Sequence, residues 1–129
     1  MDRYVMIALG GALGAIARYQ VGSMIQSRLA SGFPWGTFVV NISGCFLMGA
    51  VAVLVAQRGA ASPNWRFFIP IGFIGAYTTF STFEFETYQA VGDGAWIVVS
   101  GNVAGSVIAG YAALWLGAAM TRFVLTGAR

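Results

Sequence analysis

GFIGAYTTFSTF, residues 72–83, brings two glycines, three threonines and a serine together in the middle of an apolar run. The run extends from residue 67 to about residue 89, so its midpoint lies near Thr78, and a helix of this length crosses the ~30 Å core of a bilayer. Glycine and threonine are poor helix formers. The segment predicts a membrane helix that is broken near its middle. An unbroken helix, with its hydroxyls bonded back to its own carbonyls, is the alternative.

The composition of the whole chain predicts an integral membrane protein. Of the 129 residues, 58% are hydrophobic and 9% are charged, and the mean hydropathy is +0.76. Soluble domains carry roughly 25% charged residues. Seven arginines and four acidic residues are too few to form the polar shell that a small soluble domain needs. High hydrophobicity with low net charge also excludes a disordered chain.

Four apolar runs, the first interrupted by Arg18, predict membrane-spanning helices at about residues 4–26, 36–56, 67–89 and 95–120. Because a bilayer offers no water to backbone amides, these segments must be helical. We therefore expect one all-α, four-helix membrane domain over residues 1–129. The first run is expected to be a permanent helix, not a cleaved signal peptide. Short connections lie at residues 31–34, 57–65 and 92–94, and the last of these is a tight turn.

Four spans put both termini on the same side of the membrane. The arginines expected on that side outnumber those on the other side by five to one. An excess of arginine in cytoplasmic segments is typical of membrane proteins, so we expect cytoplasmic termini. The five are Arg3, Arg58, Arg66, Arg122 and Arg129, and the single residue on the other side is Arg28.

Residue types that the chain lacks exclude several functions. It has no histidine and no lysine, and Cys45 is its single cysteine. A zinc site built from histidine and cysteine, an intrachain disulfide and a Ser-His-Asp triad are therefore excluded. The arginines are spread along the chain, so no basic patch indicates a nucleic-acid partner. No nucleophile–base pair indicates an enzyme.

One face of the first span carries Gly10, Gly14, Arg18 and Gly22 at intervals of four residues. The glycines predict close packing against another helix. A guanidinium near the middle of a span costs at least ~2.5 kcal/mol. Arg18 is therefore expected either to face protein or water, or to extend towards the membrane surface.

Two other spans carry polar side chains on one face. Asn41 lies in the second span, and Asn102 and Ser106 lie one helical turn apart in the fourth. Such residues either form hydrogen bonds between helices or line a polar path, and the pattern leaves both open.

Phe80 and Phe83 share a helix face beside the hydroxyls of Thr79 and Thr82. The edge of a phenyl ring is positive, so two ring edges beside hydroxyls can contact a dehydrated anion weakly enough to release it. Ordinary core packing is the alternative. Glu84 and Glu86 fall about 9 and 12 Å past the midpoint of the span, so both are expected to be solvated charges near the membrane surface.

Together these segments resemble the CrcB/Fluc family of fluoride channels over nearly the whole chain. The TTFSTF core after GxxG is highly specific, and the order and spacing of the weaker motifs reinforce it. The motifs are Gly11-xx-Gly14-Ala15-xx-Arg18-Tyr19, Trp35-Gly36-Thr37-xxx-Asn41-xx-Gly44, Gly72-xx-Gly75-xx-Thr78-Thr79-Phe80-Ser81-Thr82-Phe83-xx-Glu86 and Asn102-xxx-Ser106.

The resemblance implies a fluoride-selective channel in the cell membrane that exports fluoride passively. Members pair as antiparallel dimers with two pores and a structural, untransported sodium ion at the centre. By resemblance, the backbone carbonyls of Gly75 and Thr78 would hold sodium. The fluoride pathway would contain six residues: Arg18, Asn41, Thr79, Phe80, Phe83 and Ser106.

The chain departs from the family pattern at Glu84, where relatives generally carry a small polar residue. An ionised carboxylate would repel fluoride, so Glu84 is expected to point away from the pore or to lie in a vestibule. The arginine bias also differs from the balanced charge of a chain that inserts in both orientations. The dimer partner is therefore a second copy or a close paralogue.

Two other functions fit a small four-helix membrane protein. A drug or cation–proton antiporter needs a carboxylate within its first span, and that span has none here. A non-transporting subunit of a larger complex would give no fluoride flux when purified alone.

Overall fold

In the computed structural model, which describes residues 2–29, 31–58 and 63–127, all regular elements are helices. The predicted all-α class is therefore confirmed for this part of the chain. The longest elements are α1 (Arg3–Arg28), α2 (Trp35–Arg58) and α6 (Trp96–Gly127). Between α2 and α6 lie α3 (Pro63–Arg66), the π-helix η1 (Phe67–Ile74), α4 (Gly75–Tyr77) and α5 (Phe80–Gly92).

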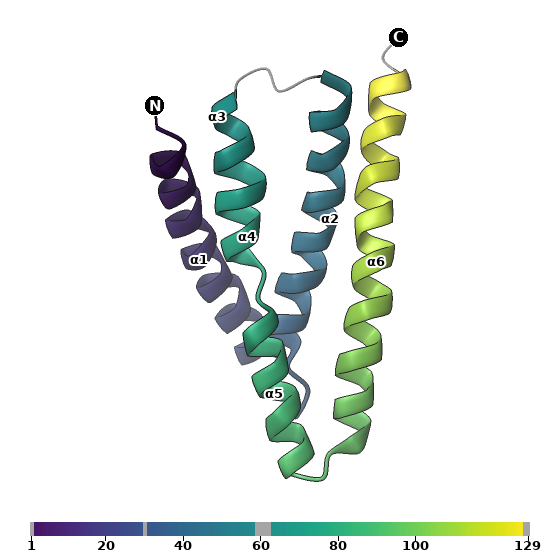
Figure 1. Ribbon diagram of the computed structural model, residues 1–129. Coiled ribbons are helices and arrows are strands. Elements are labelled where there is room, and N and C mark those ends of the chain that lie inside the picture. The colour runs from purple at the N-terminus through teal and green to yellow at the C-terminus, as the bar shows by residue number, and fades with distance from the viewer. Residues whose placement is uncertain (1, 30, 59–62, 128–129) are drawn as a thin grey trace.

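Three of these helices, α1, α2 and α6, are long and apolar enough to cross a membrane. The beginning of α1, the end of α2, α3 and the end of α6 all lie at one end of the molecule (Figure 1). The expected connection over residues 57–65 includes residues 59–62, which lie outside the described residues, as does Arg129.

The longest contact between helices joins α2 to α6, and glycine makes it close. A Cβ on Gly49 would overlap the carbonyl of Leu114, and a Cβ on Gly117 would overlap the carbonyl of Phe46. Each helix thus offers a glycine to the backbone of the other, as small residues do in membrane helix pairs. The result is a closely packed pair of regular helices along one side of the molecule.

On the opposite side, α1 packs against η1 through the glycines that the sequence singled out. Cβ atoms on Gly10 and Gly14 would overlap the carbonyls of Phe68 and Phe73, which confirms the predicted packing role of these two glycines. Pro70 lies within η1, where it has no N–H to donate to a helical hydrogen bond. The segment around this proline is a π-helix, which has a wider turn than an α-helix.

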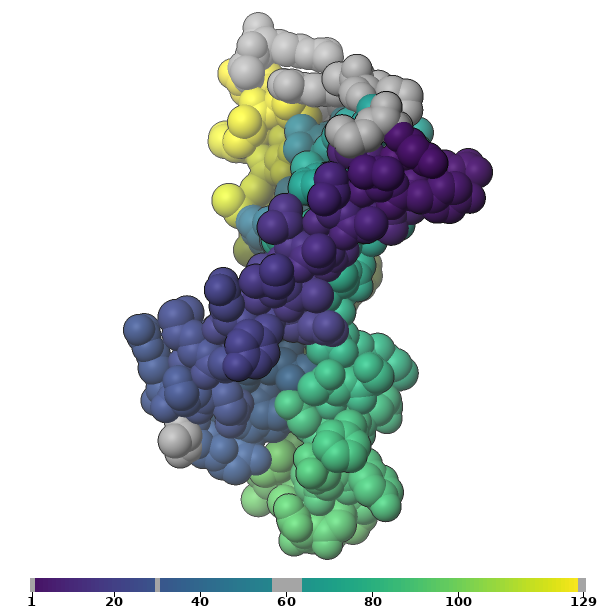
Figure 2. All heavy atoms as spheres, turned by 90° about the vertical axis from the view of Figure 1, so that its left-hand side faces the viewer, coloured from purple at the N-terminus to yellow at the C-terminus, as the bar shows by residue number. Residues whose placement is uncertain are grey.

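The predicted tight turn joins α5 to α6. Gly94 has φ of 69°, a conformation that glycine adopts at no steric cost, and its N–H donates to the carbonyl of Val91. Viewed from the side of α1, which crosses the molecule diagonally, α5 forms a separate green lobe below the packed α1–η1 region (Figure 2). Most positions of α5 are exposed, whereas most positions of η1 and α4 are buried or half-buried, so the segment after α4 is less covered than the segment before it.

Candidate functional site

The chain leaves the helical conformation between α4 and α5. Thr78 has φ −79° and ψ 156°, and Thr79 has φ −148° and ψ 120°, so both residues are extended. The interruption falls at the threonine pair near the midpoint of the apolar run, and it is visible as the non-helical link between α4 and α5 (Figure 1). Two helical parts with separate ends therefore meet here.

A side chain from α2 holds the extended backbone in place. Asn41 Oδ1 accepts a hydrogen bond from the Thr79 N–H at 2.8 Å, and Asn41 Nδ2 donates to the Thr79 carbonyl at 2.9 Å. The amide thus pairs with both polar groups of one residue, as a neighbouring strand would. Asn41, which the sequence placed on a polar face, contacts the interruption directly.

The same interactions take helical donors away from two carbonyls. In a continuous α-helix, the Thr79 N–H would donate to the carbonyl of Gly75, and the Thr82 N–H to that of Thr78. Here the first donates to Asn41, and the second donates to the hydroxyl of Thr79 at 3.3 Å. The carbonyls of Gly75 and Thr78, the two residues that the family resemblance implies as sodium ligands, both lose their helical partner.

The electrostatics of the two helix ends differ in sign. Carbonyls at the C-terminal end of α4 carry partial negative charge, and N–H groups at the N-terminal end of α5 carry partial positive charge. The interruption can therefore favour a cation on one side and an anion on the other. Gly75 lies at an exposed position, while Thr79 is only 8% exposed.

The two phenyl rings stand at the start of α5. Their ring centroids lie 5.7 Å apart at an angle of 36°. Phe83 is buried, with 8% of its surface exposed, whereas Phe80 is 74% exposed. The fold thus brings the pair together, with one ring inside the subunit and the other directed away from it.

Arg18 faces the same region from α1. It lines a groove of about 340 Å³ together with Thr79 and Thr82, and also Thr37 of α2. No hydrogen bond or ion pair to Arg18 occurs within the described ranges 2–29, 31–58 and 63–127. The guanidinium therefore places an uncompensated positive charge in a groove that reaches the interruption.

Ser106 lies in a different polar cluster, between α5 and α6. Its hydroxyl approaches Asn102 Oδ1 at 3.5 Å, Asn102 Nδ2 donates to the hydroxyl of Thr87 at 3.0 Å, and Thr87 donates to the carbonyl of Phe83 at 2.8 Å. Asn102 is 2% exposed. This chain of polar groups leads from α6 to the backbone of the buried phenylalanine.

The expectation that Glu86 is a solvated charge is wrong. Its side chain is half-buried and accepts a 2.7 Å hydrogen bond from the hydroxyl of Thr37. Its Oε2 is buried, with no hydrogen-bond partner in the described part of the chain. Glu86 follows Phe83 by three residues and so shares its buried face, a signal that was present in the sequence. Glu84, in contrast, is exposed.

Comparisons with known proteins agree with this picture. The family model described as CrcB-like protein, Camphor Resistance (CrcB), matches residues 5–118. The chain is 50% identical over 120 residues to a "Fluoride-specific ion channel FluC" of Solibacter usitatus, covering 93% of this chain and 98% of the relative. A protein of the same name from Acidobacterium capsulatum is 50% identical over 115 residues, covering 89% and 92%. A third such protein, from Maridesulfovibrio salexigens, is 40% identical over 126 residues, covering 98% and 100%.

These relatives are ion channels, which confirms that the chain is not an enzyme. Together with the three long apolar helices, they also confirm a multi-pass membrane protein.

Proposed function

The chain belongs to the CrcB family, and from this premise we propose that it is a fluoride-selective channel that lets fluoride leave the cell passively. The observation that carries the proposal is the interruption at Thr78 and Thr79, held open by the amide of Asn41. The interruption leaves two backbone carbonyls without a helical donor near the middle of the apolar run, and the two phenyl rings follow directly after it.

In this proposal, residues 63–92 cross the bilayer as one interrupted third span, so that four spans put both termini on one side. The working unit is a pair of antiparallel copies, or this chain with a close paralogue. Phe80 supports a pair, because a large ring that is 74% exposed beside a polar interruption leaves the site incomplete in one copy. A two-fold axis through the interruption would cover both exposed rings.

A structural sodium ion at the centre of the pair fits the donor set of this site. Unwound backbone carbonyls are typical ligands for sodium in membrane transport proteins. The carbonyls of Gly75 and Thr78 have lost their helical donors to Asn41 and to the Thr79 hydroxyl, so they are available as ligands. The ion would supply a fixed positive charge that holds the two helix breaks together, and it would not be transported.

Fluoride would first be attracted by a full positive charge and then by weaker partial charges along its path. The guanidinium of Arg18 draws an anion into the groove that reaches Thr79 and Thr82. Beyond it, the positive edges of Phe80 and Phe83 contact the ion without a fixed charge to trap it, which favours release as well as entry. The amide of Asn41 and the hydroxyls of Thr79 and Ser106 replace part of the lost hydration.

A drug–proton antiporter has no support in the comparisons, and α1 carries no acidic residue between Arg3 and Arg28. A non-transporting subunit is separated from a channel by the test below, because that test uses this chain alone.

The test is ion efflux from liposomes that contain only the purified chain, read with a fluoride electrode. We expect rapid fluoride efflux when a potassium ionophore removes the opposing voltage, and no chloride efflux from matched liposomes. Equal chloride and fluoride efflux would refute selectivity. Normal efflux from protein that was prepared and assayed without sodium would refute the role given to Gly75 and Thr78.

A further inference from the structure

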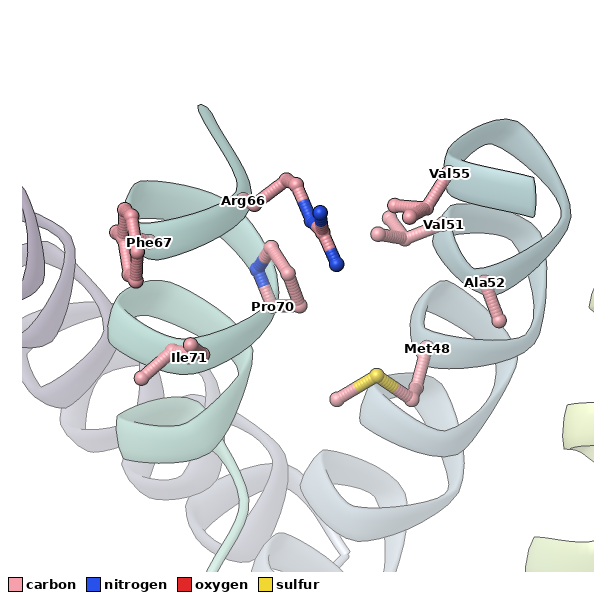
Figure 3. Close-up of a pocket in the computed structure, with 8 residues that line it drawn as sticks. All are labelled: Met48, Val51, Ala52, Val55, Arg66, Phe67, Pro70 and Ile71. Atoms are coloured by element: carbon pink, nitrogen blue, oxygen red, sulfur yellow. The ribbon is translucent and has the colours of Figure 1, made fainter. Parts of the chain in front are cut away.

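An apolar groove with one guanidinium in it opens between α2 and the α3–η1 segment. It has a volume of about 840 Å³ and is separate from the groove of Arg18. The guanidinium of Arg66 extends into the space between the two helices, facing Val51 and Val55 (Figure 3). The remaining lining residues are apolar: Met48, Ala52, Phe67, Pro70 and Ile71.

The direction of the Arg66 side chain indicates what covers this groove. An arginine next to lipid extends its charged group to the membrane surface. The guanidinium of Arg66 instead extends towards the level of Pro70, away from the end of the molecule at which α3 begins (Figure 3). No hydrogen bond or ion pair to Arg66 occurs in the described parts of the chain. The position suits an anionic group from a protein side chain that enters the groove.

The chain carries a ridge with the complementary character. Phe80, Glu84 and Tyr88 lie one turn apart on α5 and share a face. Phe80 and Tyr88 are 74% and 75% exposed, and Glu84 between them is exposed as well. The face thus offers the ring of Tyr88 to an apolar groove and the carboxylate of Glu84 to its guanidinium, while Phe80, directly after the interruption, stays in the proposed fluoride pathway.

Glu84 is the acidic residue best placed for this contact. The chain has four acidic residues, and the other three are Asp2, which caps α1, Glu86, which bonds Thr37, and Asp93, which lies in the turn at the far end of α5. Glu84 makes no hydrogen bond or ion pair within residues 63–127 or with the other described residues.

We propose that Glu84 and Tyr88 of one copy dock into the α2–η1 groove of an inverted second copy, where Glu84 pairs with Arg66. This inference rests on the proposed antiparallel pair and specifies its contact. Glu84 follows Thr79 by five residues, and Pro70 precedes Thr78 by eight. At 1.5 Å per residue, they lie about 8 and 12 Å from the interruption, on opposite sides. Inverting one copy about the interruption brings Glu84 to within about 4 Å of the level of Pro70, towards which the Arg66 guanidinium extends.

The contact also explains how the chain accommodates a carboxylate next to Phe83. Paired with a guanidinium across the interface, Glu84 presents little net charge to an anion that passes the phenyl rings. The symmetry gives two such pairs per dimer, one in each half of the bilayer.

Cysteine crosslinking tests the contact in the full-length protein. In a Cys45→Ser background, Arg66→Cys with Glu84→Cys should form a covalent dimer with a bis-maleimide that spans about 10 Å, because by helix rise the Arg66 backbone lies about 10 Å beyond the level of Glu84. The two positions are roughly 25 Å apart along one chain by helix rise, so the reagent cannot bridge them within one copy. The matched control is Arg122→Cys with Glu84→Cys, since Arg122 lies near the C-terminal end of α6, which shares one end of the molecule with α3, and does not line the groove. That control should stay monomeric on the gel.

Each result has one reading. A crosslink confined to the 66–84 pair supports the docking. No crosslink, in protein whose wild-type form conducts fluoride, overturns the docking and leaves the channel standing. A crosslink with Arg66→Cys alone means parallel copies and also overturns it. If wild-type liposomes release no fluoride, the proposed function fails independently of the crosslink.

Charge exchange gives a second, independent measurement. Arg66→Glu or Glu84→Arg alone should weaken dimer association in detergent at least about tenfold, because each places two like charges in a buried contact. The double exchange should restore association to within about twofold. A double variant no better than either single variant would overturn the pair. Loss of a bound anionic phospholipid in Arg66→Gln, seen by native mass spectrometry without loss of the dimer, would identify lipid as the occupant and overturn it too.

Discussion

α2 has a different kind of neighbour on each side. Towards α6, both helices are regular, and Gly49 and Gly117 let their backbones meet. Towards the interruption, the neighbouring backbone is not helical, and the side chain of Asn41 forms the hydrogen bonds that the helix gave up. A regular helix satisfies its own polar groups, so its neighbour needs only to fit its shape. An interrupted one also needs polar groups from its neighbour, and this requirement concentrates chemistry at one point.

The largest effect is expected from changing the rings that follow the interruption. Phe80→Ile or Phe83→Ile should lower fluoride flux at least about 100-fold, which is about 2.7 kcal/mol of barrier, because an aliphatic side chain has no positive ring edge. Fluoride-electrode efflux measures the loss, and size-exclusion chromatography checks that the dimer still assembles. Phe123→Ile, on an exposed part of α6, is the matched control and should conduct normally. Normal flux in both ring variants would disprove the ring-edge pathway.

Next in size is the loss of the amide that holds the extended residues. Asn41→Ala removes both hydrogen bonds to Thr79 and should lower flux about tenfold or more, since each unpaired buried group costs about 1–3 kcal/mol. Efflux at several sodium concentrations measures it, and the variant should need more sodium than the wild type. Ser43→Ala, on the same helix, loses a bond to the hydroxyl of Tyr77 and should change flux less than about twofold. An equal effect of both substitutions would mean that the amide has no special role.

The regular pair should respond in stability, with little change in conduction. Gly49→Val places a side chain against the carbonyl of Leu114 and should destabilise the fold by about 1–3 kcal/mol. Thermal unfolding in detergent measures it, and flux per folded dimer should stay near the wild-type value. Gly92→Ala, which meets no atom within 4 Å, should not lower the melting temperature. If Gly49→Val abolished conduction without affecting stability, the division between the two sides of α2 would be wrong.

The smallest effect is expected at Ser106, whose contact with Asn102 is 3.5 Å long. Ser106→Ala should lower fluoride flux about two- to threefold, in line with the loss of one weak polar contact. Ser100→Ala, at an exposed position of the same helix, should leave the flux unchanged. A loss as large as that of Phe83→Ile would move Ser106 from the edge of the pathway to its centre.

Composition and span length were enough to predict an all-helical membrane protein, and glycine spacing predicted that α1 packs through Gly10 and Gly14. The sequence could not show that residues 67–74 form a π-helix, because helix type depends on how Pro70 and its neighbours meet α1. Glu86 was misplaced for a similar reason. The prediction used only its distance along the helix axis, whereas the direction of its side chain depends on how α5 is turned after the interruption.

The pairing of Asn41 with Thr79 uses a donor and an acceptor on one short side chain. Hydrolysis of that amide to a carboxylate would exchange a single NH2 for an oxygen and leave the outline of the residue almost unchanged. The new carboxylate oxygen would then face the Thr79 carbonyl oxygen, so a repulsion would replace the hydrogen bond. Slow deamidation of Asn41 would thus stop conduction in a protein whose helices all remain folded.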